Sequence, residues 1–496
     1  MLKKKNFEIE LSPTKLPESS VDIGDIGTEE EKGPTSNIVE DLLSRIGMGK
    51  FHWLTYAVIS VFWICDGGEV IALSLLNYVL VHVVWHLELN EVGMIGSVIF
   101  GGFFLGSLIS GPITTCFGRR KPFLIYMILI FVLGVLSAVS PDFKWLLVTR
   151  GLYGILVGIL APLTSTMITE ITPKSKRGIN FVLVTVFFTI GEITAIILAS
   201  FLKVEEPGSN KWRALLIWVS LPALVSLILG YKYLEESPRY LLTKNAEEGI
   251  RVLNVMHRVN KRTDLPLTDD EREQVHNYVQ IQREKHTESP IMEIFTKKNL
   301  KVTINLWIAW WVLNFVYYGI LYVLPLVLAR INVNTASEDK LSYLNLFISV
   351  MGEIPAYILV MTVIEKKSFG RKNSLVITFA AGGLCCFGAH LFVDSAFMLF
   401  VFFAKFFACS SFSFIYPLTS ELYHTKCRTT GLGFASGVSR IGGVMMPWII
   451  LWALEISPTA TFVTFGVFCM IGATSIAMLP YDTTGKELDQ EPSTPH

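Results

Sequence analysis

Apolar residues in this chain gather in long runs that are separated by short polar connections. A helix needs roughly 20 mostly apolar residues to cross the hydrocarbon core of a bilayer. Runs of about this length predict a membrane-spanning helix in each of twelve segments: 52–81, 92–113, 122–140, 144–169, 179–202, 212–234, 301–328, 341–364, 373–392, 396–422, 431–455 and 459–479. The predicted fold class is therefore an all-α membrane protein with twelve transmembrane helices.

One long polar connection divides the predicted helices into two sets of six. Acidic and basic residues are mixed there, and Leu253, Met256 and Val259 indicate short amphipathic helices. We expect two six-helix bundles, a linker between them and a polar tail at each end. The expected parts are a disordered N-terminal tail at 1–50, the N-terminal bundle at 51–234, the linker at 235–300, the C-terminal bundle at 301–479 and a C-terminal tail at 480–496.

Positive charge marks one side of the predicted bundles. The connections after the second, fourth, eighth and tenth helices are rich in Lys and Arg, whereas the opposite connections carry few. Cytoplasmic connections of membrane proteins carry the excess of Lys and Arg, so we expect the linker and both termini in the cytoplasm. The plasma membrane and an intracellular vesicle membrane both stay open as the location.

The two halves of the chain repeat short motifs. Phe-Gly-Arg-Arg-Lys at 117–121 follows the second predicted helix, and Phe-Gly-Arg-Lys at 369–372 follows the eighth. The fourth and tenth helices also end alike, because Glu170 precedes Arg177 by the same interval as Glu421 precedes Arg428. Matching motifs at almost the same offset indicate an internal repeat.

Composition narrows the class of protein. Hydrophobic residues make up 51% of the chain and charged residues only 17%, with a mean hydropathy of +0.49, which excludes a soluble enzyme and a disordered chain. The 42 basic and 42 acidic residues cancel, which argues against a nucleic-acid partner. The seven cysteines lie in apolar stretches or at ends predicted to be cytoplasmic, so we expect no structural disulfide. Phosphate-binding, zinc-binding and nucleophile motifs are absent from the sequence, so we predict no enzyme activity, cofactor or metal site.

The spans and motifs together resemble the major facilitator superfamily over nearly the whole chain. The resemblance rests on the repeated Gly-Arg motifs and on Glu-Ser-Pro-Arg at 236–239 after the sixth helix. Finer motifs resemble its synaptic vesicle 2-related branch and, more distantly, the organic cation and anion transporters. They are Gly-Lys-Phe-His-Trp at 49–53, Asp66 with Glu69, Tyr-Tyr-Gly at 317–319, Gly-Glu-Ile-Pro at 352–355, Ser-Glu-Leu-Tyr at 420–423 and Ser-Arg-Ile-Gly-Gly at 439–443. The resemblance implies the major facilitator fold.

The sequence departs from the superfamily pattern at one motif. Thr115 stands where the usual motif has an aspartate, and Cys116 stands where a basic residue often follows. The usual ion pair between the bundles is therefore in doubt. The first connection on the side opposite the linker, at 82–91, is short and lacks a cysteine and a glycosylation motif, which favours the vesicle-protein branch.

Ionisable residues deep in the predicted helices are the first candidates for function, because each costs at least ~2.5 kcal/mol to insert. Asp66 and Glu69 are three residues apart and share one helix face, where two carboxylates resist double ionisation; we hypothesise that they bind a coupled proton. Glu353, two residues before Pro355, is a further candidate for proton relay or gating. Arg150 and Glu192 are candidates for structural ion pairs, and Arg150 alternatively neutralises Asp66 and Glu69.

Arg440 is the main candidate for substrate binding. A buried guanidinium presents a planar fork of donors to a carboxylate and does not deprotonate, which favours an anion. The resemblance to the organic ion transporters implies that this position selects the charge of the solute, and that Lys405 also contacts it. The alternative is an Arg440 that is bound structurally to Glu353 or Glu192.

Aromatic residues on the seventh and tenth helices provide candidates for a cavity wall. Tyr317 and Tyr318 belong to the family motif, and Tyr416 lies on the tenth helix. The competing interpretation is ordinary packing against neighbouring helices or lipid.

Charged residues at the cytoplasmic ends predict a gate. Pairs between them are expected to hold the two bundles together in one state and to break in the other, although ordinary solvated charge explains them equally well. The candidates are Arg119, Arg120, Glu170, Arg177, Arg371, Glu421 and Arg428.

The sequence predicts a secondary active transporter, most simply a proton-coupled symporter of a small organic anion that works by alternating access. Its expected partners are the solute, protons and the lipid bilayer, and we expect a monomer. Two alternatives stay open. Thr115 fits a receptor-like vesicle protein that keeps the fold without transport, and the Glu-Ser-Pro-Arg motif fits a facilitative sugar carrier.

Overall fold

The computed structural model describes residues 38–173, 176–206, 210–260, 268–284, 294–332, 342–364, 370–423 and 428–480. Twelve helices in these ranges are long and apolar enough to cross a membrane. The predicted fold class, an all-α membrane protein with twelve transmembrane helices, is confirmed.

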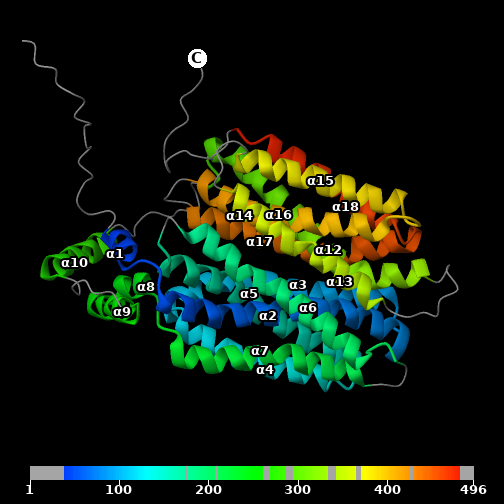
Figure 1. Cartoon of the computed structure of the whole chain (residues 1–496), viewed down its shortest axis with the longest axis horizontal. Coiled ribbons are helices and arrows are strands. Elements are labelled where there is room, and N and C mark those ends of the chain that lie inside the picture. Colours follow the sequence, from blue (N-terminus) through cyan, green and yellow to red (C-terminus); the bar gives the residue numbers. More distant parts are fainter. Residues whose placement is uncertain are drawn as a thin grey trace, which may run out of the picture.

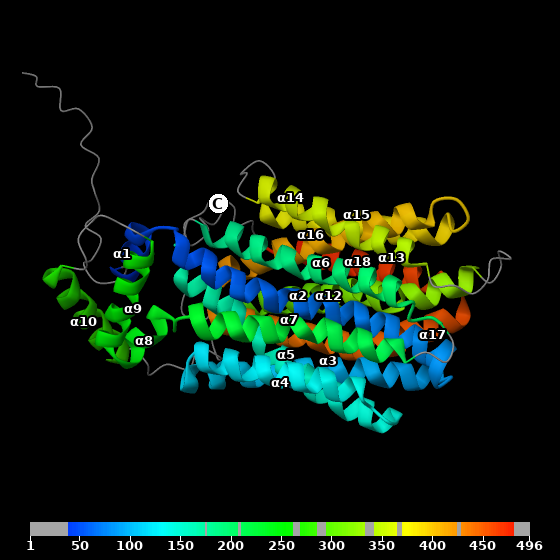
Figure 2. The ribbon, with the colours of Figure 1, turned by 60° about the horizontal axis from the view of Figure 1, so that its bottom comes forward.

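The helices form two bundles that share one long axis (Figures 1 and 2). The N-terminal bundle contains α2 (Lys50–Val79), the π-helical turn η1 (Leu80–Val84), α3 (Leu89–Phe117), α4 (Arg120–Ala138), α5 (Phe143–Ile171), α6 (Arg177–Leu202) and α7 (Lys211–Tyr233). The C-terminal bundle contains α12 (Lys297–Asn332), α13 (Tyr343–Met351), α14 (Glu353–Val363), α15 (Arg371–Leu391), α16 (Phe397–Leu422), α17 (Arg428–Ile456) and α18 (Ala460–Ala477). The eighth predicted helix, span 8 at 341–364, is thus divided into α13 and α14.

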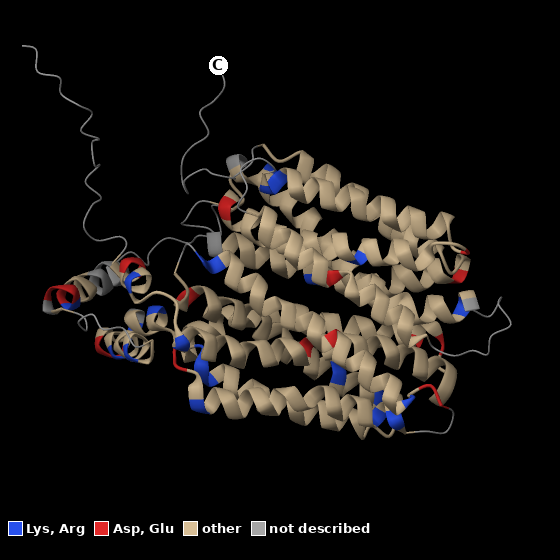
Figure 3. Ribbon diagram, viewed as in Figure 1, with Lys and Arg blue, Asp and Glu red and all other residues tan. Residues whose placement is uncertain are grey.

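Four short helices gather beyond one end of the bundles (Figure 1). They are α1 (Ile38–Ile46), α8 (Pro238–Lys244), α9 (Ala246–Val259) and α10 (Asp269–Glu284). We call this end the linker face and the opposite end the far face. Charged residues are concentrated at these two ends, and only a few lie in the middle of the bundles (Figure 3).

The two bundles meet along four pairs of described helices: α3 packs against α17, α2 against α12, and α6 against both α13 and α14. Hydrogen bonds link the bundles in the far half of these helices. The Tyr322 hydroxyl donates to the Val92 carbonyl at 2.7 Å, and the Ser97 hydroxyl donates to the Val444 carbonyl at 2.8 Å. Toward the linker face, the rings of Phe181 and Tyr416 are in contact across the bundles, with centroids 5.5 Å apart. The bundles therefore touch on both sides of the membrane midplane.

The repeated Gly-Arg motif makes a tight turn between helices. Gly118 has φ +85°, a left-handed conformation that favours glycine, and Gly370 has φ +67° at the matching place in the second half. The carboxylate of Glu236 accepts hydrogen bonds from the backbone N–H groups of Arg119 at 2.8 Å and Arg120 at 3.1 Å. Glu236, from the Glu-Ser-Pro-Arg motif, thus satisfies donors that the first turn of α4 leaves free.

Helix α1 lies within the segment that we expected to be a disordered tail. Residues 38–46 are helical because Val39, Leu42 and Leu43 bury their side chains against the linker helices. Glu40 fixes this helix with ion pairs to Arg177, at 2.6 Å, and Arg239. The expected disorder of 1–37 and of the tail beyond 480 lies outside the described residues.

The pKa of Glu40 reflects this attachment. Burial raises it, but the hydrogen bonds and charges of Arg177 and Arg239 outweigh burial and hold the pKa below its ordinary value. The stability that Glu40 contributes is therefore present above the pKa of an unfolded glutamate and is lost as the pH falls through the lower, folded pKa.

Replacing Glu40 by Gln removes both ion pairs, and we expect this to destabilise the docking of α1 by about 1 kcal/mol. Limited proteolysis of the purified protein at neutral pH measures the effect as faster cleavage next to α1. Glu248→Gln, an exposed change on α9, is the matched control. Equal cleavage rates for the two variants would contradict this role for Glu40.

Candidate functional site

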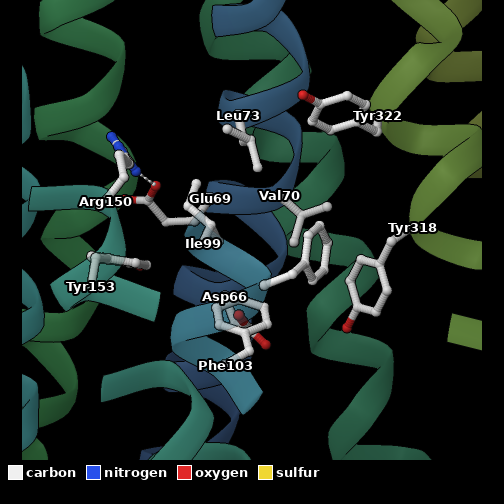
Figure 4. A pocket seen from close by; sticks show the side chains of 11 residues that line it. Asp66, Glu69, Val70, Leu73, Ile99, Phe103, Arg150, Tyr153, Tyr318 and Tyr322 are labelled. Carbon is white, nitrogen blue, oxygen red and sulfur yellow. Dashed lines mark hydrogen bonds and ion pairs between the residues drawn. The ribbon is translucent and has the colours of Figure 1, made fainter. Parts of the chain in front are cut away.

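A small cavity lies between the bundles near the middle of the membrane-spanning helices (Figure 4). Residues of α2, α3, α5 and α12 line it: Asp66, Glu69, Val70, Leu73, Ile99, Phe100, Phe103, Arg150, Tyr153, Tyr318 and Tyr322. Its free space of about 20 Å³ holds about one water molecule and no organic solute. The structure thus represents a state in which this cavity is closed to organic solutes.

Glu69 is compensated by a cation of its own bundle. Its Oε2 atom accepts a hydrogen bond from Arg150 at 2.7 Å, and its Oε1 atom accepts one from the Ser220 hydroxyl at 3.1 Å. The pair is buried, and the Arg150 guanidinium also lies 5.6 Å from the centre of the Tyr153 ring. Arg150 therefore forms the structural ion pair for which it was a candidate, and Glu69 is its partner.

Asp66 is buried one helical turn away and faces a different cation. Its main electrostatic partner is Arg440 on α17, in the other bundle, followed by Glu69. Arg440 lies over the Phe103 ring, 5.7 Å from its centre, and also interacts electrostatically with Tyr318. Asp66 and Arg440 therefore face each other across the boundary between the bundles.

A second group of charges lies where α6 meets the C-terminal bundle. The Lys405 ammonium is 2.5 Å from Oε1 of Glu353, 4.0 Å from Oε1 of Glu192 and 4.0 Å from the centre of the Tyr317 ring. Lys405, Glu192 and Glu353 are each 0% exposed. We call these three residues the interface triad.

The backbone places Glu353 beside Lys405. Span 8 breaks at Gly352, and a Cβ atom there would lie only 2.5 Å from the carbonyl oxygen of Phe402 on α16. Glycine therefore permits the close approach of the two helices that brings Glu353 to Lys405. The Tyr317 hydroxyl and the Thr189 hydroxyl both donate to Glu353, at 2.8 and 2.5 Å.

Some expectations from the sequence need correction. The deep charges, which were candidates for proton or solute binding, fall into two groups: Asp66, Glu69 and Arg150 border the cavity, whereas the interface triad, including the solute candidate Lys405, is buried away from it. The alternative in which Arg440 binds Glu353 or Glu192 is wrong, because Lys405 is the cation beside both carboxylates. Thr189 and Tyr357, which share a contact at 3.4 Å, belong to the site and carry no sequence signal of their own.

The predicted aromatic residues have different surroundings. Tyr318 borders the cavity, and its ring packs on Phe100 of the other bundle at 5.3 Å. Tyr317 bonds to Glu353 instead of facing the cavity. Tyr416 packs edge-on against Trp310 at 4.7 Å.

The predicted gate residues form pairs, but none of the pairs described for them joins the two bundles. Arg119 bonds to Glu170 at 2.7 Å, joining the end of α3 to α5, and Arg371 pairs with Glu421 between α15 and α16. Arg120 donates to the carbonyl of Tyr231 at 3.2 Å. Arg177 forms an ion pair with Glu40 on α1, and the side chain of Arg428 lies outside the described residues. Short connections place Arg119, Arg120 and Arg371 beside neighbours of their own bundles, and Arg177 beside the linker-face helix α1.

Twelve membrane-spanning helices in two packed bundles, with charged side chains at the boundary between them, are typical of membrane transport proteins. Residues 66–493 match the family described as Sugar (and other) transporter, and the chain belongs to this family of the major facilitator superfamily. Its members are transporters and not enzymes.

Curated relatives cover nearly the whole chain. It is 28% identical to the synaptic vesicle 2-related protein of Bos taurus, over 95% of this chain and 86% of the relative. It is 27% identical to the organic cation/carnitine transporter 7 of Arabidopsis thaliana, over 92% of this chain and 96% of the relative.

Among solved structures, the fold is similar to that of the proton:xylose symporter XylE. The structure bound to 6-bromo-6-deoxy-D-glucose has a TM-score of 0.68 and 19% identity, covering 88% of this chain and 98% of XylE. An inward open conformation of XylE from E. coli has a TM-score of 0.69 and 18% identity, with the same coverage.

The Glu69–Arg150 pair predicts a strong energetic coupling. Removing either partner leaves a buried unpaired charge, so we expect Glu69→Gln and Arg150→Met each to destabilise the protein by about 3–5 kcal/mol. The double variant should lose much less than the sum of the two. Unfolding in detergent micelles measures this, with the exposed Lys203→Gln as control. Additive losses would contradict the pairing.

Proposed function

We propose that this protein carries a small organic anion across the membrane by alternating access, together with a proton. The observation that carries the proposal is the state of Arg440. Arg440 is only 9% exposed, yet no described acidic residue forms an ion pair with its guanidinium, and its Nε atom has no hydrogen-bond partner among the described residues. A fixed cation with an unpartnered donor at the boundary of two bundles suits a carboxylate.

Asp66 supplies the coupling to protons in this proposal. Without solute, its negative charge balances Arg440 across the boundary. A bound organic anion takes over that cation, and a second anionic group beside it is unfavourable where the dielectric is low. Asp66 then takes up a proton, so one proton accompanies the anion. Glu69 is committed to Arg150, so the proton that we assigned to the Asp66 and Glu69 pair falls to Asp66 alone.

Alternating access follows from where the bundles touch. Hydrogen bonds join them in the far half, and a contact between aromatic rings joins them toward the linker face. Rocking of one bundle against the other opens the cavity to either side in turn. The excess of Lys and Arg at the linker face supports a cytoplasmic location for that face and for both termini.

The comparisons favour a transported solute but leave its class open. One relative is named for organic cations and carnitine, and the family name includes sugars. A facilitative sugar carrier is therefore the second candidate. Neutral sugars are bound through hydroxyl and amide groups, whereas this cavity is bordered by Asp66, Glu69 and Arg150. An anion agrees better with Arg440 at the same boundary.

The anion proposal predicts which solutes bind. Small carboxylates, tested beside amines and sugars, should raise the thermal unfolding temperature of the purified protein, since a ligand stabilises the state that binds it. Arg440→Asp should abolish this effect and the counterflow of the labelled carboxylate in proteoliposomes. Arg440→Lys should weaken binding roughly 10- to 100-fold, because it loses the fork of donors. Arg213→Lys, near the far face, is the control. Exchange of sugars or amines alone would overturn the anion proposal, and binding without exchange would indicate a receptor.

The coupling proposal predicts a separate loss in Asp66→Asn. This variant keeps a neutral side chain at all pH values, so it should exchange the carboxylate as the wild type does. It should fail to accumulate the carboxylate when an inward proton gradient is applied. Proteoliposomes with and without the gradient provide the measurement. Accumulation at the wild-type rate would rule Asp66 out as the coupling group.

A further inference from the structure

The deep charges of the described helices do not balance. Arg440 faces Asp66, Arg150 holds Glu69, and Lys405 is the cation next to both carboxylates of the interface triad. One carboxylate of the triad is therefore left without a compensating charge. An isolated ionised carboxylate in a dry interior is so unfavourable that the group is neutralised instead.

The hydrogen bonds show which carboxylate carries the charge. Glu353 accepts hydrogen bonds from the hydroxyls of Tyr317 and Thr189, and its carboxylate lies 2.5 Å from the Lys405 ammonium. These three donors are the surroundings of an ionised acid. Glu353 is therefore the charged partner of Lys405.

Glu192 has the opposite surroundings. Neither of its oxygens has a hydrogen-bond donor among the described residues, and Lys405 lies at the limit of ion-pair distance, 4.0 Å. Its carboxyl group lies close enough to that of Glu353 for the two acids to act on each other electrostatically. Two ionised carboxylates beside a single ammonium repel each other in a dry interior, so one of the two carries a proton instead.

We propose that Glu192 is a proton-binding site on the boundary between the bundles, and that it is occupied when the bundles close over the interface triad. The site is separate from the cavity at Asp66 and Arg440. Its role in transport rests on the alternating access proposed above, whereas the bound proton itself does not.

The position of Glu192 couples the proton to movement. Glu192 and Thr189 lie on one face of α6 in the N-terminal bundle, and Glu353 and Lys405 belong to the C-terminal bundle. Separation of α6 from α14 breaks the contact with Glu353 and exposes Glu192 to water, where it ionises. Closure thus takes up a proton and opening releases it.

Among the described residues, the groups around Glu192 offer no second positive charge that could replace the proton. Besides Glu353 and Lys405, the titratable groups that act on this cluster are Tyr317 on α12, Tyr357 on α14, Cys409 on α16 and Asp66 on α2. A sodium ion would need several oxygen ligands, and the ammonium of Lys405 occupies the place beside the two carboxylates. We therefore assign a proton to this site.

Infrared difference spectra of the full-length protein in detergent test the proton without any solute. The wild type should show the band of a buried protonated carboxyl group. Glu192→Gln should lose it, and Glu353→Gln should lose it too, because Glu192 then ionises beside Lys405. Lys405→Met should gain a second such band. Glu455→Gln, at an exposed carboxylate, is the control and should change nothing. A band that persists in Glu192→Gln and Glu353→Gln, or a Lys405→Met spectrum without a gain, would overturn the site.

The coupling to closure is tested with spin labels on exposed positions of α6 and α14. The distance between the labels measures how far apart the two bundles are. In the wild type, the ratio of closed to open protein should fall by up to tenfold for each pH unit above the pKa that Glu192 has when it is exposed to water. Glu192→Gln should stay closed over this range. A pH-independent ratio in the wild type, or one that follows sodium instead, would refute the coupling. Failure of every solute to exchange would defeat the proposed transport function and leave both of these measurements unaffected.

Discussion

Hydrocarbon cannot solvate a charge, and this constraint determines how the two halves of the protein meet. Each buried ion must find its partner inside the protein. Glu69 finds Arg150 within the N-terminal bundle, so that pair stabilises the bundle itself. Asp66 and Glu353 each have a partner in the other bundle: Asp66 interacts electrostatically with Arg440, and Glu353 accepts a hydrogen bond from Thr189. Pairs within a bundle thus hold its shape, whereas contacts across the boundary depend on the relative position of the two halves.

The two charged groups differ in how water reaches them. Asp66 borders a cavity that holds about one water molecule, whereas the interface triad has no exposed surface. A group beside a cavity can exchange a solute after a small movement of the helices, but a sealed group exchanges its proton only when the helices part. In the proposed mechanism, the site for the solute is therefore separate from the site that responds to closure.

The helices could be predicted from the sequence because length and apolar character are local properties. The break of span 8 was visible only as a Gly-Glu-Ile-Pro motif, and the capping of α4 by Glu236 was not visible at all. The pairing of charges could not be predicted, since partners such as Lys405 and Glu192 come from helices that are far apart in the sequence. Arg440 shows the difficulty: the residue itself is conspicuous, but its neighbours depend on the packing of α17 against α3. The gate pairs were expected between the bundles, but Arg119–Glu170 and Arg371–Glu421 each join helices of one bundle, because short connections bring their helix ends together.

The interruption at Gly352 has a mechanical consequence. Helix α13 is attached near the far face, where the Tyr343 hydroxyl contacts Glu205, whereas α14 begins at Glu353 and runs toward the linker face. Gly352 keeps helical backbone angles, φ −61° and ψ −23°, but Pro355 has no N–H to bond back to the preceding turn, and membrane helices kink at such places. One turn of backbone in mid-membrane is therefore softer than the helix on either side of it, and it can serve as a hinge for half a helix.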